Sequence, residues 1–214
     1  MKRELPTSTY LTLGPKPDVQ GLMGIVMTAD AYRNFIFGNL KSLDKDISDR
    51  KFGTDIMSEW KKISPSLKRL EVAGRSIPGL DTIWKVRSAS PLVVIMLVVA
   101  TMVSAIIPLK TIWLFYGPFY AALIMLAIWG ATSQLSSKLI NNYLRRHGDK
   151  HSADIGLIKD FVQKLLKSLS HYFREAKVDS AKHPLELYNA DYKKIRILKS
   201  PGFRRTYKVI IETS

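Results

Sequence analysis

The chain has 214 residues, of which 33 are Lys or Arg and 18 are Asp or Glu, so its formal net charge at pH 7 is +15. It contains no cysteine, which excludes disulfides, thiolate nucleophiles, iron–sulfur clusters and cysteine-ligated zinc. One block is almost free of charge, and the soluble segments on either side of it are too small to hold a large catalytic core alone.

The amino-terminal residues 1–27 carry turn signals in LGPKPD and two glycines in GLMG, with weak periodicity, so we expect a loop-like arm. From Thr28 onward, apolar residues recur at spacings of three and four, which predicts a helix starting there. The stretch KFGTDIMSEWKKISPSLKRLEVAGR predicts two short helices, the second with Ser64 as N-cap and Pro65 at its first position. Residues 28–87 are therefore predicted to be a helical soluble segment.

The block over 88–137 contains a single charged side chain, that of Lys110. Each run on either side of it matches one bilayer crossing, because roughly 20 apolar residues span a hydrocarbon core of ~30 Å. A lysine in the middle of one buried helix would cost ~2.5–3.5 kcal/mol, whereas Pro108 favours a turn at that point. We predict a transmembrane helical hairpin, with crossings at about 90–107 and 111–135 and Lys110 at its exposed tip.

Two sets of residues are expected to position this hairpin. Tryptophan rings favour the headgroup region, and small residues let helices approach closely. The predicted interface anchors are Trp84, Trp113 and Trp129, and the predicted packing positions are Gly117, Ala121, Ala100 and Ser104. The block lies too far along the chain to resemble a signal peptide, so we expect it to remain in the mature protein.

Orientation follows from Lys and Arg near the crossings, since these residues are preferentially retained on the cytoplasmic side. Basic residues flank both outer ends of the hairpin and only Lys110 lies between the crossings. Both termini are therefore expected on the cytoplasmic, matrix or stromal side of a cell membrane or organelle inner membrane.

The carboxyl-terminal segment, 138–214, is the more basic one. A juxtamembrane helix is expected to end at Gly148, and Ser152 is expected to cap a new amphipathic helix. The alternating stretches YKKIRIL and RTYKVII, separated by the turn signal SPG, predict a β-hairpin. The expected fold class is thus mainly α and integral to the membrane: a two-helix transmembrane hairpin flanked by small helical soluble segments, with a C-terminal β-hairpin.

The stretch HGDKHSAD clusters potential metal ligands, because His147, Asp149, His151 and Asp154 lie within eight positions. Gly148 argues against one continuous helix there, so we favour a solvated juxtamembrane loop over a metal site. We expect no metal ligands and no cofactor.

Basic residues after the membrane are candidates for contact with anionic lipid headgroups or an acidic partner. These candidates are Lys138, Arg145, Arg146, Lys150, Arg204 and Arg205. The tail interleaves basic and aromatic residues as RNA-binding surfaces do, but we favour retention of topology and solvation over RNA binding.

No nucleophile elbow, Walker loop, dinucleotide fingerprint or metalloprotease signature is present, so no catalytic residue is assigned and we expect no enzyme activity. The leading hypothesis is a non-catalytic accessory or assembly subunit of a larger membrane complex, respiratory or energy-converting by loose analogy, with other membrane-protein subunits as partners. One alternative is a membrane tether whose basic carboxyl-terminal domain binds RNA, a ribosome or anionic lipid. Another is a small oligomeric channel or transporter.

Overall fold

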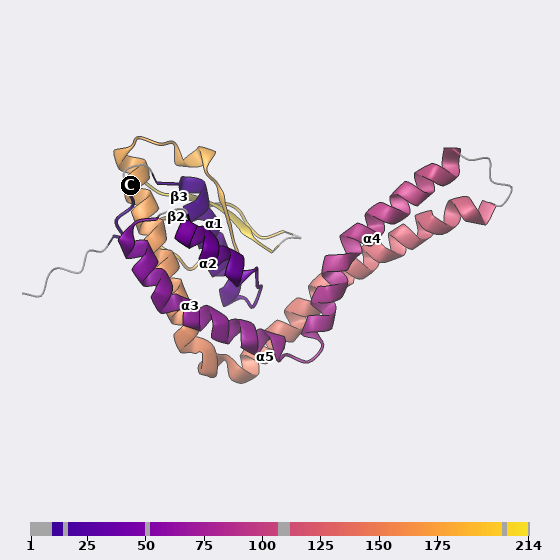
Figure 1. The fold of residues 1–214 in the computed structure, drawn as a ribbon, viewed down its shortest axis with the longest axis horizontal. Coiled ribbons are helices and arrows are strands. Elements are labelled where there is room, and N and C mark those ends of the chain that lie inside the picture. Colours follow the sequence, from indigo (N-terminus) through magenta and orange to yellow (C-terminus); the bar gives the residue numbers. More distant parts are fainter. Residues whose placement is uncertain (1–9, 15–16, 50–51, 107–111, 203–204, 214) are drawn as a thin grey trace, which may run out of the picture. The chain divides into compact units, whose positions relative to one another are not determined.

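The computed structural model describes residues 10–14, 17–49, 52–106, 112–202 and 205–213, and for 105, 106, 112–115 and 133 it describes the backbone only. The chain is mainly helical, with a small three-stranded antiparallel sheet near its carboxyl terminus (Figure 1). The helices are α1 (Val19–Arg33), α2 (Leu40–Asp49), α3 (Thr54–Arg75), α4 (Leu80–Ile106) and α5 (Ile112–Glu175), followed by a 3-10 helix, η1 (Ser180–Lys182). The strands are β1 (Leu185–Leu187), β2 (Ile195–Lys199) and β3 (Tyr207–Ile211).

These elements form two compact units. Unit 1 combines Met1–Val72 with Asp149–Ser214, and unit 2 is Ala73–Gly148. The two segments that flank the charge-free block therefore fold together, although the sequence did not indicate whether they meet.

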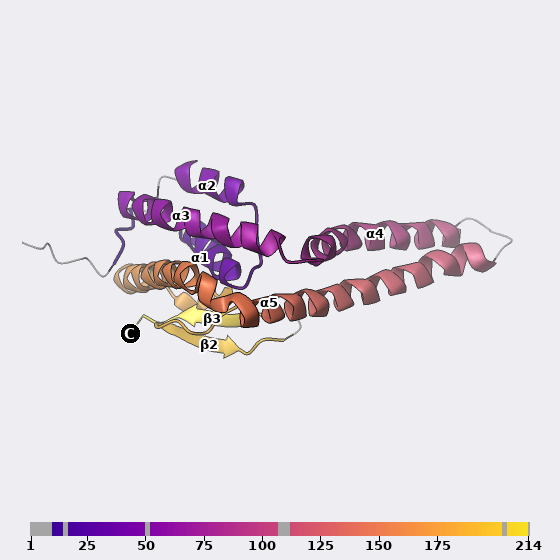
Figure 2. The same ribbon diagram turned by 90° about the horizontal axis from the view of Figure 1, so that it is seen from below.

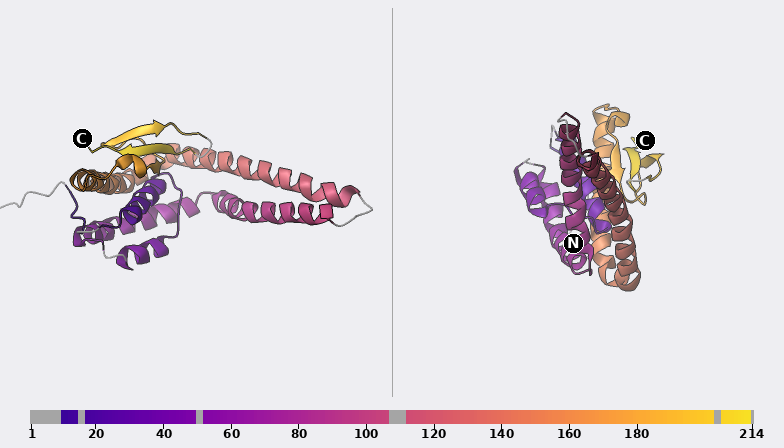
Figure 3. Two further views of the ribbon diagram at one scale, coloured as in Figure 1. Left: turned by 90° about the horizontal axis from the view of Figure 1, so that it is seen from above. Right: turned by 90° about the vertical axis from the view of Figure 1, so that its right-hand side faces the viewer.

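Unit 1 packs its helices and its sheet around an apolar core. Figures 2 and 3 show α1 lying between α3 and the sheet. The carboxyl-terminal part of α5 contributes the face predicted from its periodicity, since Ile158, Phe161, Val162, Leu165, Leu166, Leu169 and Phe173 are all buried. Helix α3 adds buried Ile56, Trp60, Ile63, Leu67 and Leu70, and the sheet adds Leu185, Leu187, Val209, Ile210 and Ile211.

The predicted β-hairpin is confirmed, because β2 and β3 pair antiparallel with Ile195 opposite Ile211. The sheet order is β1-β3-β2, so β3 is central and a third strand, β1, completes the sheet. The sequence did not indicate β1 because its three residues are too few to show an alternating pattern.

Helix α1 begins at Val19, nine residues before the predicted start at Thr28. The Asp18 side chain caps it by accepting a hydrogen bond from the Gly21 N–H at 2.9 Å. Glycines weaken a helix in isolation, but buried neighbours such as Leu22 and Val26 offset that cost through tertiary packing. The helix ends at Arg33, and Phe35 follows in a left-handed conformation with φ of 55°.

Two further helix boundaries differ from the sequence prediction. Helix α3 is a single helix that contains Pro65, so Ser64 does not start a second one. Helix α5 continues through Gly148, so the predicted break and the Ser152 cap are also wrong. In α3 the residues on both sides of the proline, Ile63 and Leu67, are buried, and this packing offsets the missing N–H of Pro65.

Unit 2 contains α4 and the first part of α5, which run in opposite directions (Figure 1). Both helices are long and apolar enough to cross a membrane by length and composition. In their most apolar 18-residue windows only 6% and 18% of the residues are buried. This low burial is compatible with membrane spans, whereas an all-round apolar core helix of a soluble protein would be mostly covered. The predicted tip, Lys110, lies outside the described residues.

Candidate functional site

A buried carboxylate on α1 accepts hydrogen bonds from the loop between β1 and β2. Asp30 is fully buried, and its oxygens accept hydrogen bonds from the backbone N–H groups of Tyr188 and Asn189 at 2.5 and 3.3 Å. They also accept from the Asn189 side-chain amide at 2.8 Å and from the Tyr192 hydroxyl at 2.6 Å. A charge removed from water needs such a set of donors, so this loop can only take this shape against α1.

Arg33 lies one turn further along α1 and faces the same loop. Its two terminal nitrogens donate to the two carboxylate oxygens of Asp191 at 2.9 and 2.8 Å, in the bidentate arrangement typical of strong arginine–carboxylate pairs. One of them also donates to the Tyr192 hydroxyl at 2.6 Å, and the guanidinium lies 5.1 Å from the centre of that ring. Lys159 of α5 approaches the same Asp191 carboxylate at 2.8 Å.

These contacts shift the ionisation of two members of the cluster. The hydrogen bond from Arg33 holds the pKa of Asp191 well below its usual range, and the bond from Lys159 adds to that effect. Burial raises the pKa of the Tyr192 phenol far above its usual value, and the neighbouring negative charge of Asp30 raises it further. At neutral pH the cluster therefore holds an ionised Asp191 and a neutral Tyr192, which donates one hydrogen bond and accepts another.

Gln163 on α5 fixes the next residue of the loop. Its amide oxygen accepts from the Lys193 N–H at 2.7 Å, and its amide nitrogen donates to the Lys193 carbonyl at 3.1 Å. At the same open end of the hairpin, where the Glu212 N–H donates to the Lys194 carbonyl, the Ser170 hydroxyl donates to the Glu212 carbonyl. Side chains of α1 and α5 thus clamp the entry and the exit of the β2–β3 hairpin. We call Asp30, Arg33, Asn189, Asp191 and Tyr192 the polar lock.

The hydrogen bonds of the polar lock join α1 to the β1–β2 loop. Its donors and acceptors are directed at one another, and Arg33 Nε is the only buried side-chain polar atom without a hydrogen-bond partner in the part of the chain that is described. A catalytic group must instead meet a substrate atom. Within the same described residues, no three His, Cys, Asp or Glu side chains are grouped to hold a metal ion.

The hairpin that the lock holds is basic and exposed. From Tyr192 to Ile211 the sequence has seven Lys or Arg residues and no Asp or Glu. Arg196 and Lys199 are exposed on β2, the edge strand, and Lys208 is exposed on β3. Ile197 and Leu198 are also exposed, with relative accessibilities of 47% and 50%. Aliphatic and positive side chains thus follow one another along the β2 edge.

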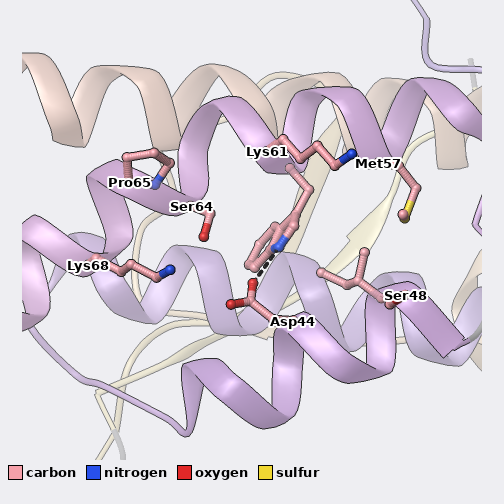
Figure 4. A pocket seen from close by; sticks show the side chains of 9 residues that line it. Asp44, Ser48, Met57, Lys61, Ser64, Pro65 and Lys68 are labelled. Carbon is pink, nitrogen blue, oxygen red and sulfur yellow. Dashed lines mark hydrogen bonds between the residues drawn. The ribbon is translucent and has the colours of Figure 1, made fainter.

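A hollow of about 380 Å³ lies between α2 and α3 (Figure 4). The Trp60 indole N–H donates to the Asp44 carboxylate at 2.7 Å within it, and Lys61 and Lys68 stand at its rim. The Trp60 ring packs against Phe161 of α5, with ring centres 6.0 Å apart. The hydrogen bond joins α2 to α3, and the ring contact joins α3 to α5.

The basic residues predicted to meet lipid or an acidic partner do not form one cluster in a single unit. Lys138, Arg145 and Arg146 are exposed on the part of α5 in unit 2, and Lys150 is exposed on the part in unit 1. Arg205 is half-buried, with a positive φ of 58°, and Arg204 lies outside the described residues. Their contacts with lipid or a partner stay a prediction.

The predicted anchors and packing positions fall on α4 and α5. Trp84 and Trp129 are half-buried, and the side chain of Trp113 is outside the description. Of the packing positions, Gly117 is exposed, while Ala121, Ala100 and Ser104 are half-buried. Among the side chains that the structure describes between 90 and 140, the buried ones are Ser90, Ala122, Thr132, Ser136 and Ile140.

The HGDKHSAD stretch is helical, so the prediction of a solvated loop is wrong. His147 stacks on Tyr143 of its own helix, with ring centres 4.6 Å apart. His151 is buried against Phe35. Both Asp154 carboxylate oxygens accept from Nε of Arg69 on α3 at 3.1 Å, and one also accepts from Nη2 at 2.5 Å. The last two residues therefore tie α5 into unit 1.

Sequence reasoning missed the polar lock because its members on α1 lie 158 to 162 positions from those in the β1–β2 loop. One local signal was present: Asp30 and Arg33 interrupt an otherwise apolar helix face at a spacing of three. Charged residues inside a buried face indicate partners elsewhere in the fold.

Comparisons with protein-family models, with curated proteins and with solved structures found no match.

Proposed function

We propose that this protein is a non-catalytic, membrane-anchored accessory or assembly subunit of a larger membrane complex. In this proposal, α4 and the first part of α5 cross the membrane as a hairpin, and unit 1 provides the surface for other subunits. The observation that carries the topology is the polar lock, because it joins residues from before the first apolar helix to residues from after the second.

Unit 1 contains Asp30 and Tyr192 in direct contact, so both must lie on one side of any membrane. A chain that leaves and returns to the same side crosses an even number of times, which agrees with two apolar stretches. Exposed aliphatic side chains along α4, such as Ile95, Met96 and Met102, support the anchor because water is a poor environment for such a surface.

The absence of cysteine allows a direct test of this topology. Single cysteines replace Ser42 on α2, Ser200 after β2, or Lys110 between the spans, and a membrane-impermeant maleimide is added to sealed, oriented vesicles. We expect Ser42→Cys and Ser200→Cys to react together and Lys110→Cys to react only from the opposite side. Reaction of Ser42→Cys and Ser200→Cys from opposite sides would overturn the hairpin.

The accessory role has its own test. The protein is extracted from its native membrane with a mild detergent, separated by size, and the co-migrating proteins are identified. We expect a large assembly that contains other membrane subunits. Migration as a lone small oligomer would contradict the accessory role and would make ion flux in liposomes the next measurement, since the small-channel alternative predicts it.

A further inference from the structure

We infer that the β2–β3 hairpin of unit 1 docks on an anionic bilayer surface, with Arg196, Lys199 and Lys208 facing phosphate headgroups and Leu198 entering the interface. This inference rests on the proposed membrane anchor and names the surface that unit 1 contacts. Its residues differ from the basic positions that the sequence indicated.

The basic side chains of the hairpin are only partly balanced within the sheet, where Glu186 of β1 lies opposite Lys208. In the strand register, Lys199 lies directly opposite Lys208, and like charges at such positions repel because their Cβ atoms are only ~5 Å apart. Within the described residues, no ion pair involves Arg196, Lys199 or Lys208, while lysines elsewhere in unit 1 pair with Glu59 or Asp191. An anionic surface would supply the further negative charge.

The apolar part of the surface points to lipid. Leu198 is the extra residue of a bulge between Ile197 and Lys199, and it is 50% exposed, whereas Ile197 lies opposite the buried Val209 on the other face of the sheet. Aliphatic side chains beside lysines and arginines are typical of segments that lie in the headgroup region. Single-stranded RNA is usually bound by exposed aromatic rings, whereas the described aromatic residue of β3, Tyr207, is half-buried.

Addition of another strand is a weaker explanation of this surface. Strand β2 is at the sheet edge, but lysines and a bulge on an edge strand hinder pairing with a further strand. Membrane attachment instead uses the side chains. The clamps at Asp30, Arg33 and Gln163 hold the hairpin in one shape, which lowers the entropy lost on docking. A tethered unit also meets the bilayer at a high effective concentration.

The test uses the full chain in lipid nanodiscs, with Ser200→Cys carrying a polarity-sensitive fluorophore next to the hairpin. In nanodiscs with about one-third anionic lipid, we expect a blue shift and quenching by headgroup-labelled lipid, both lost at high salt and absent with zwitterionic lipid. The matched control reporter is Ser42→Cys on α2, which should stay in water in both lipids.

Charge and apolar variants separate the two parts of the surface. The double variant Arg196→Gln/Lys199→Gln should lower the docked-to-undocked ratio roughly fivefold per charge removed. Leu198→Ser should reduce the blue shift while the salt dependence remains. An unchanged melting profile for each variant would show that unit 1 stays folded.

Two outcomes would overturn the inference. A reporter at position 200 that stays in water in anionic nanodiscs would exclude docking, while retention of the protein in the nanodisc would show independently that the anchor holds. A reporter that responds to a single-stranded RNA oligomer, and not to anionic lipid, would assign the surface to nucleic acid instead. Neither result depends on which subunits co-migrate in the native membrane.

Discussion

The Tyr192 hydroxyl donates a hydrogen bond to the Asp30 carboxylate at 2.6 Å, although 162 positions and both apolar helices separate the two residues in the chain. This contact closes unit 1 across the part of the sequence that we propose to lie in the membrane. It also connects α1 to the loop that starts the basic hairpin.

Removing the buried carboxylate should destabilise unit 1. Asp30→Ala leaves four donors from Tyr188, Asn189 and Tyr192 without an acceptor, so we expect the free energy of unfolding to fall by about 3–5 kcal/mol. Chemical denaturation in detergent, followed by circular dichroism, measures this change. The exposed Asp46→Ala is the matched control and should stay within about 0.5 kcal/mol of the natural protein.

Stability should fall in acid because of Asp191. Its pKa is lowered in the folded state by the hydrogen bond from Arg33, so the resulting stabilisation is present above the unfolded pKa of about 4 and is lost as the pH falls toward the folded value. We expect the melting temperature to decrease below about pH 4. Asp191→Asn should melt at a lower temperature at neutral pH and show a shallower acid dependence.

The acid dependence of the melting temperature needs a control carboxylate outside the polar lock. Asp160 is exposed on α5, so Asp160→Asn should retain the natural acid profile. An Asp191→Asn profile parallel to that of the natural protein would show that other carboxylates, such as Glu59, account for the acid dependence. Burial opposes ionisation of Glu59, but the hydrogen bonds and positive charges of Lys164 and Lys62 together outweigh it, so its pKa is also lowered.

Two glycine substitutions test the backbone conformation, one at Gly148, where the sequence predicted a helix break, and one at Gly79, where the backbone turns. Gly148 lies inside α5 with open space around its missing Cβ, so Gly148→Ala should stabilise the protein by about 0.5–1 kcal/mol. Gly79 has a φ of +79°, so Gly79→Ala should destabilise it by about 1 kcal/mol or more. Thermal melting distinguishes the two signs, and destabilisation by Gly148→Ala would indicate that α5 is interrupted there.

Trp60 should contribute mainly through its ring and secondarily through its indole N–H. It is 5% exposed and packs against Phe161, so Trp60→Ala should cost about 3–5 kcal/mol of the free energy of unfolding. Trp60→Phe keeps most of the packing and loses the hydrogen bond to Asp44, so a smaller cost, of about 1–2 kcal/mol, is expected. Equal costs for the two variants would contradict this division.

The sequence by itself determined the features that depend on neighbours in the chain. The periodic apolar residues from Ile158 to Phe173 predicted the buried face of α5, because a helix brings residues three and four apart to one side. The alternation on either side of SPG predicted the β2–β3 pair for the same local reason. The two apolar stretches were likewise evident from composition.

Only the tertiary structure decided what depends on distant partners. The start of α1 at Val19 and the continuity of α3 through Pro65 oppose local propensity, and burial of Leu22, Val26 and Leu67 reverses that balance. The polar lock is decided in the same way, because nothing near Asp30 in the chain indicates Tyr192. Desolvation makes a buried charge costly unless its partners arrive together, and only the complete fold of unit 1 brings them together.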